Sequence, residues 1–110
     1  MAPNDNLAVL ADTFRLLGDP SRLAILFACA DEPRSVGAIA TATGLAPSLV
    51  SHHLRLLRAA RMVRPERRGR HVYYALADAH VARVIDDMAD HVGEEEAAHV
   101  HVLPSSGSAA

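Results

Sequence analysis

The fold of this chain is decided by residues 47–74, which read PSLVSHHLRLLRAARMVRPERRGRHVYY. Proline opens a predicted helix that runs to about Ala60, because the first helical position needs no hydrogen-bonded N–H. Four apolar side chains are expected to face inward from this helix: Leu49, Val50, Leu54 and Leu57. Residues 62–63 and 72–74 are β-prone runs on either side of a glycine-containing turn, and they predict a β-hairpin.

The polar residues of the same stretch predict contact with double-stranded DNA. A recognition helix presents the side chains near its N-terminus to the major groove, and its N–H groups and hydroxyls can bind phosphates. The side chains in that position here are Ser48, Ser51, His52, His53 and Arg55. The hairpin adds three arginines that can follow the DNA backbone or enter the minor groove: Arg67, Arg68 and Arg70. A helix pair with a solvated charged face is the alternative, but the two elements together favour DNA binding.

Two helices are predicted upstream of this stretch. Apolar side chains recur at steps of three and four over residues 5–17, which indicates a helix with one buried stripe: Leu7, Leu10, Phe14 and Leu17. Gly18 ends this helix. Asp19 and Pro20 then begin a second helix as its cap and its first residue, and the sequence DEP at residues 31–33 breaks it.

A short third helix completes a helix-turn-helix. Ser35 caps this helix over residues 36–43, Gly44 stops it, and the helix from Pro47 follows after a short turn. A last helix is predicted from Asp78 onward, and it is expected to fade in the glutamate-rich stretch at residues 94–96. The predicted fold class is therefore mainly α with a small β-hairpin, a winged helix-turn-helix in which four helices, two strands and a fifth helix follow one another.

The chain of 110 residues has room for one small domain, and dimerisation is a common way to add buried surface to such a core. We expect this domain to span residues 1–103 and a disordered tail to follow at 104–110. The one cysteine, Cys29, excludes an internal disulfide and is expected to be a small buried hydrophobe in a reducing compartment. No leader and no apolar run of about 18 residues is visible, so the predicted location is cytoplasmic.

Charge is divided between two parts of the chain, although the net charge is only −2. Residues 47–74 carry seven arginines and one acid, Glu66, whereas residues 77–101 carry seven acids and one arginine, Arg83. A basic middle and an acidic end argue for two different partners, a polyanion and a cation.

The acidic last helix carries four candidate metal ligands: Asp78, His80, His91 and Glu94. The two histidines are eleven residues apart, which is about three helical turns, so both point the same way. The rise between them is about 16 Å, whereas a metal–nitrogen bond is about 2 Å long. One helix therefore cannot close the site, but two antiparallel copies can, which predicts a homodimer with two equivalent sites.

Each candidate ligand also has a purely structural alternative. Asp78 could simply cap the helix, a lone histidine is more often a surface side chain, and Glu94 could be solvated. His99 and His101 follow, and they could either add nitrogen ligands or belong to a solvated tail. Four nitrogen and oxygen ligands suit tetrahedral zinc, whereas five or six suit nickel or cobalt.

Three motifs of this sequence resemble the ArsR/SmtB family of metal-sensing winged-helix regulators. They are DPSRL at residues 19–23, VSHHLRLL at 50–57 and GRHVYY at 69–74. The resemblance spans roughly residues 7–95, and it implies a homodimer with the first and last helices at its interface. It also implies a repressor that sits on operator DNA and is released by metal.

The resemblance extends to the metal site, because the four candidate ligands match the family's interfacial site, which binds zinc, nickel or cobalt in relatives. In that family the outer nitrogen of a metal-bound histidine links to the region of the recognition helix, and His91 is the candidate for this role. The family's other site uses cysteines, and residues 35–46 contain none, which disfavours arsenic, lead and cadmium. The tail histidines and the sequence DAHVA favour nickel, whereas Glu94, where nickel sensors carry histidine, favours zinc. Both metals stay open, with cobalt as a further alternative.

Two other functions are left open by the sequence. One is a winged-helix regulator that no metal controls, and the other is a dimeric adaptor that keeps the fold without binding DNA. An enzyme is disfavoured, because no glycine-rich phosphate loop is present and four protein ligands leave a metal no open position for chemistry.

Overall fold

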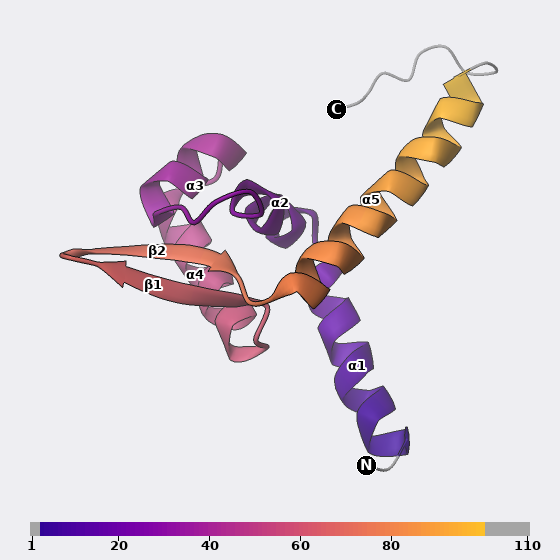
Figure 1. Ribbon diagram of the computed structural model, residues 1–110, viewed down its shortest axis with the longest axis horizontal. Helices are drawn as coiled ribbons and strands as arrows, with labels where there is room; N and C mark the ends of the chain where they lie inside the picture. Colours follow the sequence, from indigo (N-terminus) through magenta and orange to yellow (C-terminus); the bar gives the residue numbers. More distant parts are fainter. Residues whose placement is uncertain (1–2, 101–110) are drawn as a thin grey trace. The chain divides into compact units, whose positions relative to one another are not determined.

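The computed structural model describes the backbone of residues 3–100 and the side chains of residues 6–93. Within them, five helices and one antiparallel hairpin follow one another: α1 (Pro3–Leu17), α2 (Pro20–Ala28), α3 (Val36–Thr43), α4 (Pro47–Ala59), β1 (Val63–Arg68), β2 (His71–Leu76) and α5 (Ala79–Val100) (Figure 1). This order confirms the winged helix-turn-helix class. The chain divides into two compact units, of which the first ends at Asp78 and the second begins at Ala79.

The boundaries of α2 and α3 follow from capping residues that form the expected hydrogen bonds. Oδ2 of Asp19 accepts from the N–H of Arg22 at 3.0 Å, and Oγ of Ser35 accepts from the N–H of Ala38 at 3.1 Å. Gly44 has a φ of 77°, a left-handed conformation that glycine adopts without steric cost, and it ends α3.

The core of the first unit lies among α2, α3 and α4, which contact one another in pairs. Its largest side chains are almost fully buried: Ile25, Leu26, Ile39, Val50, Leu54 and Leu57. Three of the four side chains expected to face inward from α4 are therefore confirmed. Leu49 is the exception, because 39% of its surface is exposed and His53 takes an inward position instead. The buried face runs from Val50 at steps of three and four residues, and Leu49 lies at its edge.

The apolar stripe of α1 is not buried against the rest of the first unit, to which this helix belongs. Leu7, Leu10 and Phe14 expose between 50% and 59% of their surfaces, which contradicts the expectation of a buried stripe. Leu17, at the end of the helix, is half-buried. Periodicity shows that one face of a helix is apolar, but it does not show whether the same chain covers that face.

The hairpin is longer than predicted. β1 and β2 stay paired up to Arg68 and His71, so residues 66–68 lie in a strand rather than in the turn. Only Gly69 and Arg70 remain as the loop. Gly69 has a φ of 65°, which suits the first position of a tight two-residue turn.

A short bridge ties the hairpin to the helix-turn-helix. The N–H of Arg34 donates to the carbonyl oxygen of Tyr74 at 3.0 Å, and the N–H of Tyr74 donates to the carbonyl oxygen of Arg34 at 2.8 Å. Ala75 and Leu76, which follow in β2, are buried. An isolated two-stranded hairpin is only marginally stable in water, so these contacts stabilise the wing on the first unit.

α5 continues to Val100, although the sequence suggested that it would fade in the glutamate-rich stretch at residues 94–96. Glutamate and alanine are strong helix formers, which accounts for the longer helix. The tail expected at residues 104–110 lies outside the described residues. Between residues 3 and 100, no helix has the length and hydropathy needed to cross a membrane.

Helix α4 is followed by a left-handed turn at Arg61, which has a φ of 64°. The N–H of Arg61 donates to the carbonyl oxygen of Arg58 at 2.9 Å, and the N–H of Met62 donates to that of Leu57 at 2.8 Å. These bonds satisfy carbonyl groups at the helix end. Glycine usually occupies the left-handed position of such a turn, because a Cβ atom is strained there.

We expect Arg61→Gly to raise the free energy of unfolding by about 0.5–1 kcal/mol, because relief of the strain outweighs the added entropy of the unfolded chain. Urea denaturation should show a higher midpoint with an unchanged m value. Arg55→Gly is the matched control in the interior of α4, and it should lower the free energy of unfolding by about 1 kcal/mol. A lower midpoint for Arg61→Gly would show that the turn is not strained.

Candidate functional site

The start of α4 presents polar side chains next to an open helix end. Four of the five side chains expected to reach DNA from this helix are exposed: Ser48, Ser51, His52 and Arg55. Ala46 precedes the helix, and its side chain forms no capping hydrogen bond with the first N–H groups. Such N–H groups, together with the positive end of the helix dipole, are suited to bind a phosphate.

His53 does not belong to this surface, which corrects the expectation from the sequence. Only 8% of the residue is exposed, because position 53 lies on the inward face of α4. Its Nδ1 atom is buried and has no hydrogen-bond partner among the described residues. Of the two adjacent histidines, His52 alone remains a candidate for contact with DNA.

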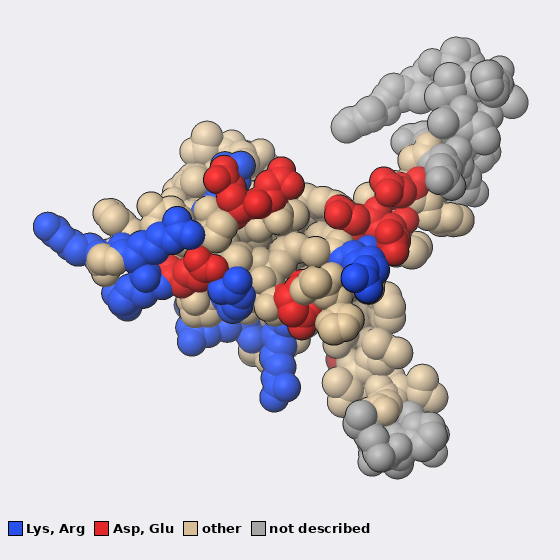
Figure 2. Space-filling view, in the orientation of Figure 1, with Lys and Arg blue, Asp and Glu red and all other residues tan. Residues whose placement is uncertain are grey.

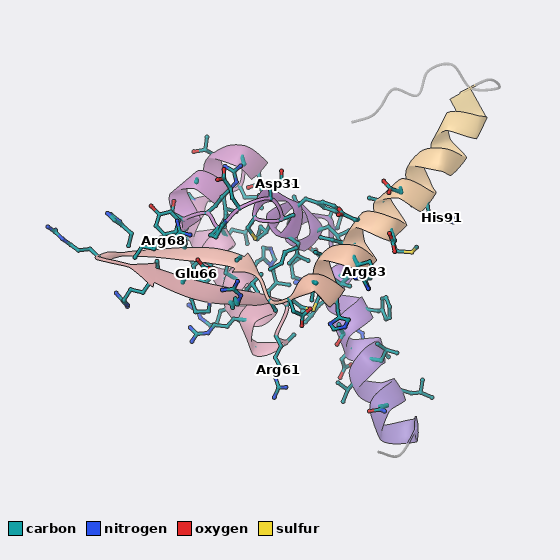
Figure 3. The ribbon with its side chains drawn as sticks, in the orientation of Figure 1. Asp31, Arg61, Glu66, Arg68, Arg83 and His91 are labelled. Atoms are coloured by element: carbon teal, nitrogen blue, oxygen red, sulfur yellow. The ribbon has the colours of Figure 1, made fainter. Side chains whose placement is uncertain are left out.

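The hairpin carries four arginines, which fall into two groups. Arg67 and Arg70 are exposed, and neither forms an ion pair with another described residue. Arg64 and Arg68 both bind the carboxylate of Glu66, at 2.7 and 3.1 Å. Figure 3 labels Glu66 and Arg68 on the hairpin. Hydrogen bonds from Arg68, and then from Arg64, lower the pKa of the Glu66 carboxyl group. This carboxylate is therefore charged at neutral pH.

Arg64 is a candidate that the sequence analysis missed. The predicted strand stopped at residue 63, so the arginine seemed to lie outside regular structure. In a strand, alternate residues face the same side, and the pairing of β1 extends to Arg68. A period of two from Arg68 through Glu66 leads to Arg64, and this is the signal that could have found it.

The two signs of charge gather on different elements of the surface. Figure 2 shows arginine side chains over the hairpin, whereas acidic side chains gather over α5. The acids of α5 include three exposed aspartates: Asp86, Asp87 and Asp90. The arginines of residues 47–74 and the acids of α5 thus lie on different parts of the surface, in line with the charge division predicted from the sequence.

The candidate metal ligands lie on or next to α5. Asp78 directly precedes the helix, and His80 and His91 are exposed on it. The side chains of Glu94 and His99, and all of His101, lie outside the described residues. Within the described part of the chain, no three potential ligands come together in one place. The continuous helix keeps the two histidines about 16 Å apart along its axis.

Cys29 offers no thiolate ligand. Its side chain is buried, and Sγ donates to the carbonyl oxygen of Ile25 at 3.3 Å. Burial raises the pKa of the thiol to about 11, so the group is neutral at physiological pH. The expectation of a small buried hydrophobe is confirmed.

Comparison with known proteins shows which family this chain is similar to. The family model described as "Bacterial regulatory protein, arsR family" matches residues 19–64. Over 92 residues the chain is 42% identical to the "Transcriptional repressor SmtB homolog" of Synechocystis, a match that covers 84% of this chain and 70% of that protein.

Two solved structures share the fold. The NMR structure of the cadmium metal-sensor CMTR from Mycobacterium tuberculosis is 43% identical, with a TM-score of 0.63, over 70% of this chain and 80% of that one. A homodimeric winged helix-turn-helix DNA-binding domain from Mycobacterium bovis is 28% identical, with a TM-score of 0.72, over 99% of this chain and 97% of that one. The chain therefore belongs to the ArsR/SmtB family of bacterial regulatory proteins, and it is a winged-helix transcriptional regulator rather than an enzyme.

Proposed function

We propose that this protein is a homodimeric repressor that binds double-stranded operator DNA and changes its DNA affinity when a transition metal binds to α5. One observation carries the proposal: α5 displays two exposed histidines about three turns apart, in a chain whose first unit is a winged helix-turn-helix. The first unit would bind the DNA, and α5 would bind the metal.

The DNA-binding half is supported by the exposed polar start of α4. Its hydroxyls and N–H groups suit phosphates, and His52 and Arg55 would reach base edges in the major groove. The exposed Arg67 and Arg70 of the wing would contact the backbone or the adjacent minor groove. The relative from Synechocystis is described as a repressor, which supports the same sign of regulation here.

The metal half is supported by the chemistry of the donor set. Two imidazoles and two carboxylates, from His80, His91, Asp78 and Glu94, would give four nitrogen and oxygen ligands, which suits a tetrahedral site. Since the histidines lie about 16 Å apart on one helix, the ligands would come from two copies. Both described imidazoles are exposed, as a shared site would require.

A homodimer is supported by apolar side chains that each unit by itself leaves exposed. They include Leu7, Leu10 and Phe14 on α1 and Val84, Met88 and Val92 on α5. Such rows are typical of surfaces that another chain covers. The similar domain from Mycobacterium bovis is described as homodimeric.

The donor set favours Ni²⁺ or Zn²⁺, with Co²⁺ as an alternative. One relative is described as a cadmium sensor, but the only cysteine here is buried with a pKa of about 11. A cadmium–thiolate site is therefore not supported. Four donors favour zinc, and additional nitrogen ligands from His99 and His101 would favour nickel.

The coupling between metal and DNA would follow from linkage. If the metal-bound dimer binds DNA more weakly, DNA weakens metal binding by the same factor, typically about 5–150-fold. Ligands from two copies would fix the angle between protomers, and with it the spacing of two recognition helices against half-sites about one DNA turn apart. The outer ring nitrogen of His91 would donate a hydrogen bond that fixes the orientation of the imidazole ring, as is common in metal-bound histidines.

The double variant Arg67→Ala/Arg70→Ala is expected to bind a duplex more weakly and with a flatter salt dependence. Each lost phosphate contact changes the slope of log K against log salt by about 0.9. Fluorescence anisotropy with a duplex selected from a random pool by the wild-type protein measures this slope. Arg15→Ala removes an exposed positive charge from α1 and should leave the slope unchanged. A wild-type protein without salt-dependent duplex binding would instead be a dimeric adaptor.

His91→Ala is expected to abolish the change in DNA affinity that Ni²⁺ or Zn²⁺ causes in the wild type, about 5–150-fold. One titration of protein and duplex, followed by anisotropy and by the absorption spectrum of the metal, measures both events. Asp87→Ala removes an exposed acid from the same helix and should behave like the wild type. Tight metal binding and metal-induced DNA release by His91→Ala would contradict the site. Unchanged DNA affinity of the wild type with both metals would leave a regulator that no metal controls.

A further inference from the structure

One acidic side chain lies inside the basic hairpin. Glu66 is the one acid among residues 47–74, and it sits opposite Tyr73 in the paired strands. Its side chain is 25% exposed, whereas those of Arg64 and Arg68 are 55% and 56% exposed. The Glu66 side chain is thus less exposed than the side chains of its two arginine partners.

The two oxygens of this carboxylate are divided between the two arginines. Nη1 of Arg64 donates to Oε2 at 2.7 Å, and Nη2 of Arg68 donates to Oε1 at 3.1 Å. The guanidinium of Arg68 also lies 4.9 Å from the ring centre of Tyr73. A shared anion and an aromatic ring thus fix the positions of two cations on one face of β1.

The other arginines of the wing lie outside this network. Arg67 follows Glu66 directly, so it faces the opposite side of the strand. Arg70 is in the loop, and neither residue forms an ion pair within the described part of the chain. The wing therefore has one face on which a carboxylate offsets one of two positive charges, and a second set of arginines that is available to an anion.

We propose that Glu66 is a positioning residue that limits the charge that the wing offers to DNA. Its carboxylate holds Arg64 and Arg68 together and cancels one of their two positive charges. A phosphate that approaches this face releases fewer counterions, which weakens the part of DNA binding that does not depend on sequence. This inference rests on the DNA-binding function proposed above.

The variant Glu66→Gln tests this role, because it removes the charge and keeps the shape of the side chain. We expect the slope of log K against log salt to steepen by about 0.9 for each wing in contact with DNA. The ratio of the variant's duplex affinity to that of the wild type should therefore fall about 3.5-fold per wing as salt rises from about 50 to about 200 mM. Anisotropy with a duplex of scrambled sequence provides the measurement, and thermal unfolding verifies that the variant is folded.

Two further variants separate a local role from a general effect of charge. Asp12→Asn removes an acid that pairs with Arg15 on α1, so it changes the net charge equally away from the wing. In a background with Arg64→Ala and Arg68→Ala, Glu66→Gln should have no larger effect than Asp12→Asn, because the residues it acts through are gone.

The outcomes distinguish this inference from the proposed function. A steeper slope for Glu66→Gln that depends on both arginines supports the role. A slope equal to that of Asp12→Asn, or weaker binding by Glu66→Gln, overturns it while leaving DNA binding intact. Absence of salt-dependent duplex binding by the wild type would overturn both proposals together.

Discussion

The structure depends on the burial of one face of α4. Val50, Leu54 and Leu57 are buried there, and the helix contacts α2, α3 and β1. Full burial of a side chain of this kind contributes about 1.5–3 kcal/mol to the stability of the fold. A rotation of the helix by one residue would expose several of these side chains and lose their contributions together. The opposite face of α4 therefore points to solvent, which is why Ser51 and Arg55 are available to a ligand.

The same core sets the position of the wing. Met62 and Val63 are buried directly after the turn at Arg61, so the chain enters β1 from a fixed point at the end of α4. The backbone bridge between Arg34 and Tyr74 holds the second strand to the connection that precedes α3. The recognition helix and the wing are therefore parts of one packed unit, with little freedom to adjust separately to a DNA surface.

Features governed by local rules could be predicted from the sequence, and those that depend on distant partners could not. The caps at Asp19 and Ser35 need only neighbouring residues. Arginine and glutamate have no strong preference for strands, so the extension of β1 arises only from its pairing with β2. The burial of His53 follows from the same helical periodicity as Val50 and Leu57, but the polar side chain hid this position from a search for apolar residues. The proposed metal ligands rest on helical spacing and on the family resemblance, because no three of them come together among the described residues and their partners would belong to another copy.

If the exposed leucines and phenylalanine of α1 are the surface that a second copy covers in the proposed homodimer, protein abundance becomes a variable of regulation. When apolar burial is completed only by a second copy, the stability of the folded state rises with concentration by mass action. A sparse population of chains would be turned over faster, and it would also lack the paired recognition helices that two half-sites require. Loss of stability and loss of repression would then occur together, so that silencing begins above a threshold number of molecules rather than in proportion to synthesis.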